Sequence, residues 1–188
     1  MRAARRFVDH LEAHDRLAAT AHIRIELYGS LALTGRGHAT DIAILLGLNG
    51  NRPSTIDPDT VPSLISKIRD SGKIALNGKQ TIAFHEVESL LFLTDQILPE
   101  HANGMRFMAF DSQGGQILSK DYFSVGGGYV VSHDEGDRAE TRGHNIILPY
   151  PFTSAGELLA MGRDHGLSIA EIMLANESAW RSESETIA

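Results

Sequence analysis

A histidine that follows a glycine-rich turn is the residue of this chain best placed to do chemistry. His38 closes the run Gly35-Arg36-Gly37-His38, which stands between an alternating strand pattern and the start of an apolar helix. Glycines on both sides of an arginine let backbone N–H groups turn inward around an anion, and the arginine can bind a carboxylate with both arms. A neutral imidazole in this position is a suitable base near physiological pH. The same residues also fit a plain tight turn with a solvated arginine, and the spacing favours neither interpretation.

A second histidine lies in a turn that leads directly into a strand pattern. His101 precedes Asn103-Gly104, a pair typical of tight turns, within the segment Leu98–Met105. Loops that carry a histidine beside a rigid strand often hold functional residues, although a solvated histidine is the commoner case. His101 is therefore a second candidate.

Two further motifs carry no chemistry of their own. The three glycines Gly126–Gly128 weaken a strand unless a ligand or a second backbone comes close, and a wide bulge explains them as well. His85 and Glu86 fall on opposite faces of an expected strand, so they do not form a joint metal site. No other pair of histidines has a convincing ligand spacing, and we expect this chain to bind no metal.

The composition is that of an acidic globular protein. The 188 residues carry a net charge of −7, with 42% apolar and 22% charged residues, which argues against disorder and against nucleic-acid binding. There is no cysteine, so the chain cannot hold an iron–sulfur cluster through its own thiolates. No apolar run reaches the length of a membrane span, and Asp9, Glu12 and Asp15 argue against a transit peptide. We therefore expect a cytoplasmic protein.

Hydrophobic periodicity predicts the elements that hold these residues. Helices are expected at 3–18, from Thr40 or Asp41 to Leu48, and from Asp57 onward. Strands are expected at 22–28, 73–76, 80–85, 105–110, 116–125 and 129–131, with Asn77-Gly78 predicting a type I′ hairpin. This order predicts an α+β fold, a two-layer sandwich of helices on a mixed, largely antiparallel sheet.

A polar stretch divides the chain. Residues 133–154 are expected to be a linker between a domain at 1–132 and two helices, at 155–165 and 168–180. The two helices bury too little area to fold alone and should belong to a larger domain. Their acidic residues argue against a DNA-binding helix-turn-helix.

Several motifs resemble those of one enzyme family. The runs LYGSLALTGRGHATDIAILLGLNG, IDPDTVPSLISKIRDSG, HANGMRF and LSKDYFSVGGGYVV are similar, in order and spacing, to the β domain of the iron–sulfur-dependent bacterial L-serine dehydratases. The segment PFTSAGELLAMGRDHGLSIAEIMLANE resembles the opening of the catalytic α domain of the same enzymes. The resemblance implies a serine dehydratase β domain at 1–132 and a truncated start of the α domain at 155–188.

The resemblance also implies a fold, a reaction and a site. The β domain is similar to the allosteric substrate-binding domain of D-3-phosphoglycerate dehydrogenase. The family converts L-serine to pyruvate and ammonia at a 4Fe-4S cluster, whose cysteines lie in the α domain beyond the segment present here. Carried onto this sequence, the family's histidines fall on His38, expected as the base, and His101, expected as a mobile acid/base or a substrate gate. Arg36, Thr40 and Asn103 are expected to orient the substrate or the histidines.

The same resemblance implies partners. We expect L-serine as substrate, the α domain as partner on the same or a separate chain, and a homo-oligomer, in an enzyme of serine metabolism and gluconeogenesis. The chain begins at the methionine of MRAARR, after the serine-rich segment that family members usually carry, and we expect a piece of a single-chain enzyme that is inactive alone. Two alternatives stay open: a regulatory module that binds serine or another anion without chemistry of its own, and a purely structural subunit.

Overall fold

The computed structural model describes residues 1–132, 147–179 and 182. The chain forms two units, Met1–Ala139 and Glu140–Ala188, which we describe separately. Among the described residues, no helix has the length and apolar character needed to cross a membrane.

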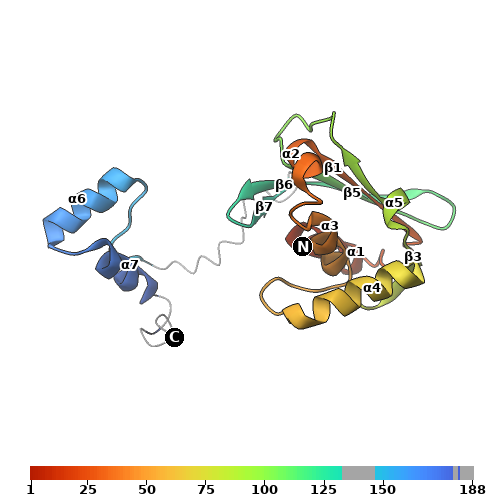
Figure 1. The fold of residues 1–188 in the computed structure, drawn as a ribbon, viewed down its shortest axis with the longest axis horizontal. Helices are drawn as coiled ribbons and strands as arrows, with labels where there is room; N and C mark the ends of the chain where they lie inside the picture. Colours follow the sequence, from red (N-terminus) through yellow and green to blue (C-terminus); the bar gives the residue numbers. More distant parts are fainter. Residues whose placement is uncertain (133–146, 180–181, 183–188) are drawn as a thin grey trace. The chain divides into compact units, whose positions relative to one another are not determined.

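In the described part of the chain, a five-stranded mixed sheet forms the centre of the first unit (Figure 1). Its strands, in spatial order, are β4 (Leu90–Leu93), β1 (His22–Tyr28), β5 (Gly104–Phe110), β6 (Gln116–Gly126) and β7 (Tyr129–Val131). Strands β1 and β4 pair in parallel, and the other neighbours in this sheet are antiparallel. The predicted α+β fold with a mixed, largely antiparallel sheet is confirmed.

Helices cover one side of this sheet, as Figure 1 shows for α1 (Arg2–Ala13), α3 (Thr40–Leu48) and α4 (Val61–Ser71). Helix α1 packs against α3, and α4 packs on α3 and on a separate hairpin of β2 (Lys73–Leu76) and β3 (Gln80–Ala83). Short elements complete the unit: α2 (Gly29–Thr34), α5 (Glu86–Ser89) and a 3-10 helix at Pro58–Thr60.

The core lies between the sheet and these helices. The alternate residues of β1 that face the helices are fully buried, as the sequence pattern predicts: Ile23, Ile25 and Leu27. Phe7 of α1 contacts Phe107 of β5, with ring centroids 5.4 Å apart. Strand β1 is thus fixed in the middle of the fold, and its last residue, Tyr28, leads directly into the candidate site.

The opposite face of the sheet holds a smaller apolar cluster and a charged network. The buried members of this cluster are Tyr28, Leu98 and Phe123. Arg106 of β5 binds Asp121 of β6 with both arms, at 2.7 Å each, and this hydrogen bonding raises the pKa of Arg106. The Tyr28 hydroxyl donates to Glu26 at 2.6 Å. Burial, followed by the bond to Glu26, raises the pKa of Tyr28 to about 12.

The sequence pattern misses three short elements and overextends the first helix. Elements α2, α5 and β4 are not predicted, and α1 ends at Ala13 because Asp15 adopts a left-handed backbone with φ 56°. Strand β3 ends at Ala83 rather than at residue 85. The Asn77-Gly78 hairpin is confirmed, since both residues have the positive φ of a type I′ turn, 50° and 68°.

The second unit contains the two predicted helices, α6 (Ala155–His165) and α7 (Ile169–Glu177). Gly166 follows α6 in the left-handed conformation, and Ser168 caps the start of α7 through a capping box with Glu171. The Asn176 side chain exchanges hydrogen bonds of 2.9 and 2.7 Å with the backbone of Tyr150. Helix α7 ends at Glu177 rather than at the predicted Trp180, which lies outside the described residues. Residues 133–146 of the expected linker also lie outside them.

Candidate active site

A tight turn between α2 and α3 exposes His38 to solvent. Helix α2 separates this turn from the strand that was expected to lead straight into it. The N–H of His38 donates to the carbonyls of Thr34 and Gly35 at 3.2 Å each, and the N–H of Thr40 donates to Gly35 at 2.8 Å. These two amides are therefore bonded inside the turn and are not available to an anion.

The His38 ring is held in one tautomer. Its Nδ1 lies 3.0 Å from the carbonyl oxygen of Thr34, which can only accept, so the proton of the neutral ring is on Nδ1. The other nitrogen, Nε2, is then unprotonated on an exposed side chain. This arrangement suits a base.

The His101 ring is held in the opposite tautomer. The backbone N–H of Asn103 donates to Nδ1 of His101 at 3.0 Å, so the proton of the neutral ring is on Nε2. The side chain of His101 is half-buried. It can donate a proton or a hydrogen bond, whereas His38 can accept one.

The loop that carries His101 is fixed to the first turn of α2. The N–H groups of Gly29 and Ser30 donate to the carbonyls of Gln96 and Ala102, at 2.8 and 3.1 Å. Glycine is required at position 29, because its φ is +49° and a Cβ there would lie 2.4 Å from the Ala102 oxygen.

The two histidines therefore stand beyond opposite ends of α2. His101 is in the loop bound to the start of this helix, and His38 is in the turn that follows its end. Six helical residues span about 9 Å. The structure thus brings the two predicted histidines to one region, separated by a single helix, without placing them in contact.

Arg36 lies on an aromatic ring rather than on an acid. Its guanidinium carbon is 4.7 Å from the centroid of Phe92 in β4, a cation–π contact. Gly35 makes room for this approach, since a Cβ there would lie 3.0 Å from the Phe92 ring. A stacked guanidinium keeps its N–H donors in its own plane, where a carboxylate can accept from them. Phe92 is a site residue that the sequence pattern missed together with β4.

Neither Thr40 nor Asp41 caps α3, so this prediction is wrong. The residue before the helix is Ala39, which has a left-handed backbone with φ 54° and ψ 34°, and no side chain caps the first turn. The Thr40 amide already donates within the turn to Gly35, so Thr40 is the first helical residue. Asp41 instead accepts a hydrogen bond from Arg69 of α4 at 3.1 Å.

Asn103 contacts the site through its backbone. Its side-chain amide donates to the Ser124 carbonyl in β6 at 3.3 Å, and the N–H of Ser124 donates back to the Asn103 carbonyl at 3.0 Å. The side chain is therefore bound to the sheet, and the N–H of Asn103 sets the orientation of the His101 ring.

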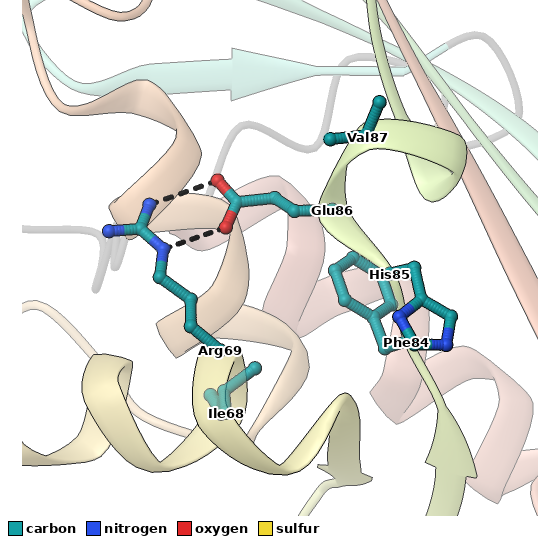
Figure 2. Close-up of a pocket in the computed structure, with 6 residues that line it drawn as sticks. All are labelled: Ile68, Arg69, Phe84, His85, Glu86 and Val87. Atoms are coloured by element: carbon teal, nitrogen blue, oxygen red, sulfur yellow. Dashed lines mark hydrogen bonds and ion pairs between the residues drawn. The ribbon is translucent and has the colours of Figure 1, made fainter.

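A pocket at the start of α5 adjoins Asp41 through Arg69. Figure 2 shows its lining residues: Ile68, Arg69, Phe84, His85, Glu86 and Val87. Arg69 binds Glu86 with both arms, and the hydrogen bond with Glu86 is the main cause that raises the pKa of Arg69. Sequence spacing gives no signal for this residue, because Asp41 and Glu86 lie 28 and 17 positions away from it.

The donor set of this chain does not fit an iron–sulfur cluster. The sequence contains no cysteine, and such clusters are held mainly by thiolates. Among the described residues, no group of three or more histidine, aspartate or glutamate side chains is arranged to hold a metal ion. The chemistry that the described residues can supply is proton transfer and carboxylate binding.

The comparisons with known proteins agree on one family. The sequence pattern of a family described as serine dehydratase beta chain matches residues 1–135. L-serine dehydratase of Streptomyces coelicolor is 44% identical over 185 residues, which cover 98% of this chain and 41% of that protein. L-serine dehydratase TdcG of Escherichia coli is 43% identical over 188 residues, and L-serine dehydratase of Haemophilus influenzae is 35% identical over 179 residues.

These two matches cover 98% and 95% of this chain and 40% and 39% of the respective relatives. The chain thus spans about two fifths of the length of the curated relatives it matches. The family pattern extends over both histidine-bearing loops, residues 35–39 and 98–103, and over the whole five-stranded sheet. The chain belongs to the serine dehydratase beta-chain family.

Proposed function

We propose that this chain is the proton-transfer part of an L-serine dehydratase, which converts L-serine to pyruvate and ammonia. Its family membership and the names of its relatives support the proposal. The observation that carries it is the pair of opposite tautomers, with Nε2 unprotonated on His38 and protonated on His101.

Elimination of water from serine needs both kinds of group. The α-proton must be removed while the β-hydroxyl takes up a proton and leaves as water. We assign removal of the α-proton to Nε2 of His38. His101 is assigned the second role, as a mobile acid/base or as a gate on the substrate. The aminoacrylate product then tautomerises to an imine, which water hydrolyses to pyruvate and ammonia.

The remaining predicted residues are assigned to orientation. The guanidinium of Arg36, stacked on Phe92, is proposed to bind the carboxylate of serine. Thr40 lies half-buried at the start of α3 and is proposed to contact the substrate beside His38. Asn103 orients His101 through its backbone N–H.

This chain contains no cysteine that could hold the iron–sulfur cluster implied by the family resemblance, and we place that cluster in the α domain. Residues 155–188 are proposed to be the start of that domain, after a linker at 133–154 and a β domain at 1–132. Leu33 of α2 and Ile97 of the His101 loop are 67% and 69% exposed, and such apolar side chains beside a site suit a protein partner. We propose a cytoplasmic homo-oligomer in which the α domain covers this surface.

The substitution His38→Ala tests the assignment in the complete enzyme, in which this chain acts with its α domain. We expect turnover to fall at least about a hundredfold, with serine affinity retained, because a general base contributes that much or more. His14→Ala is the matched control. His14 follows the last residue of α1, and its Nδ1 also lies near the carbonyl oxygen of the residue four positions earlier, 2.9 Å from that of His10. This variant should keep full activity.

Other outcomes point to the other functions. Preserved turnover with altered serine affinity or cooperativity would favour a regulatory module that binds serine without chemistry of its own. If substitutions at His38 and His101 both left the kinetics unchanged, a purely structural role would be favoured.

A further inference from the structure

The guanidinium of Arg69 connects α4 to two other segments of the first unit. Its Nε and Nη2 donate to the two carboxylate oxygens of Glu86 at 2.8 and 2.9 Å (Figure 2), and Nη2 also donates to Asp41 at 3.1 Å. Helix α4 is itself anchored in the core by Ile65 and Ile68, which are 5% and 7% exposed. Arg69 therefore reaches from a fixed helix to two carboxylates on other segments.

The first carboxylate belongs to the helix that closes the His38 turn. Asp41 is the second residue of α3 and directly follows Thr40, whose N–H donates to Gly35 across the turn. The contact of Arg69 with Asp41 therefore restrains Thr40, which ends the turn two residues after His38.

The second carboxylate belongs to the short helix that precedes β4, the strand whose Phe92 contacts Arg36. Glu86 begins α5, and α5 continues directly into β4. In β4, Phe92 lies under the Arg36 guanidinium. Arg69 thus contacts both segments that border the turn: α3, through Asp41, and the segment of α5 and β4, through Glu86.

We expect these contacts of Arg69 to fix the orientation of the segments they join more than to raise the free energy of unfolding. The side chain of Arg69 is 43% exposed, and partly exposed ion pairs add little to the free energy of unfolding. A bidentate pair with a third contact nevertheless fixes directions, because the planar guanidinium holds its donors in a rigid fork. The effect of losing it should therefore appear in the turn rather than in global stability.

We propose that Arg69 is a positioning residue for His38, and that it fixes the turn through Asp41 and Glu86. This inference rests on the proposed role of His38 as the base. With the turn fixed, the Nδ1–H of His38 stays on the Thr34 carbonyl and Nε2 stays free to accept a proton. Without Arg69 the ring can rotate off that carbonyl, and the fraction of rings with a free Nε2 falls.

Arg69→Ala in the 188-residue chain tests the proposal by NMR at about pH 8, where a histidine ring is mostly neutral. The shifts of the two ring nitrogens of His38 report the tautomer, and hydrogen exchange of the Thr40 amide reports the turn. We expect a change toward the Nε2–H form and exchange that is about fivefold faster. Arg16→Ala is the matched control, since Arg16 also makes a long-range contact, donating to the Ile117 carbonyl in β6 at 2.6 Å.

Two further variants separate geometry from charge. Arg69→Lys keeps the charge without the fork, so it should restore only part of the Thr40 protection, and Glu86→Gln should give an intermediate effect. In the complete enzyme, Arg69→Ala should lower kcat about fivefold with little change in KM.

A parent-like tautomer and parent-like exchange in Arg69→Ala would overturn the proposal, and so would the same change in Arg16→Ala. Failure of the proposed function is visible separately. Turnover that survives His38→Ala would overturn the assignment of the base, whereas the NMR results test the contact between Arg69 and the turn directly.

Discussion

At the scale of single residues, Ala39 has the most costly backbone conformation near the site. Its φ of 54° lies in the left-handed region, which is unfavourable for a residue with a Cβ by about 1 kcal/mol or more. We expect Ala39→Gly to raise the free energy of unfolding by about 0.5–1 kcal/mol in urea titrations. The same substitution at Ala43, inside α3, should lower it by a similar amount. A loss of stability in Ala39→Gly would show that the turn is not strained there.

Ionisation of Tyr28 is expected to lower the stability of the fold at high pH. Burial and the bond to Glu26 raise its pKa to about 12, whereas the pKa of a tyrosine in an unfolded chain is about 10. The folded state holds the proton more tightly, so this contribution is complete below about pH 10 and is lost as the pH rises toward 12. Tyr28→Phe removes the titrating group, and its unfolding free energy should fall less steeply across this window than that of the parent chain.

The same variant should lose about 1 kcal/mol at pH 8, because Glu26 then lacks the hydroxyl donor. Urea titrations from pH 8 to 12 measure both effects. Tyr129→Phe, at a side chain that is 55% exposed, is the control for removal of one phenol. Parallel pH profiles for Tyr28→Phe and the parent chain would contradict the expectation.

At the scale of elements, an apolar contact holds the His101 loop on the sheet. Leu98 is 7% exposed, packs with Tyr28 and Phe123, and forms an isolated bridge with His101. We expect Leu98→Ala to cost about 2–3 kcal/mol in the free energy of unfolding and to speed amide exchange at Asn103. Ile97→Ala, at a 69% exposed neighbour, should change stability by less than about 0.5 kcal/mol. Equal effects of the two substitutions would exclude this anchoring role.

Elements with a strong local signal could be predicted from the sequence, and elements without one could not. Strand β1 has a clear period of two, and Asn77-Gly78 has the conformational freedom that one turn type requires. Strand β4 and helix α5 have four residues each, too few for any period, and β4 exists because it pairs with β1 some 65 positions away. The end of α1 depends on the backbone of Asp15, which periodicity does not report.

At the scale of the whole molecule, the candidate site also combines features that have a local sequence signal with features that have none. The turn that carries His38 and the loop before β5 that carries His101 could be predicted, since both depend on neighbouring residues. The tautomers depend on single hydrogen bonds, and Phe92 and Arg69 join the site only through contacts between distant segments. The family resemblance implies roles for His38 and His101. The hydrogen bonds that set their tautomers for these roles are visible only in the fold.

At the scale of the whole molecule, we propose that the chain supplies proton-transfer groups, and its sequence contains no cysteine to supply a thiolate ligand. This proposal predicts how the chain behaves alone. We expect the purified 188-residue chain to form no pyruvate from L-serine, because no cysteine in it can hold the cluster that we place in the α domain. Joined to an α domain that carries the cluster, it should form pyruvate. The His38→Ala version of the same assembly should form it at least about a hundredfold more slowly. A coupled assay for pyruvate and one for ammonia measure both products. Pyruvate formation by the iron-free chain would show that the described residues complete the reaction by themselves and would refute this division of labour.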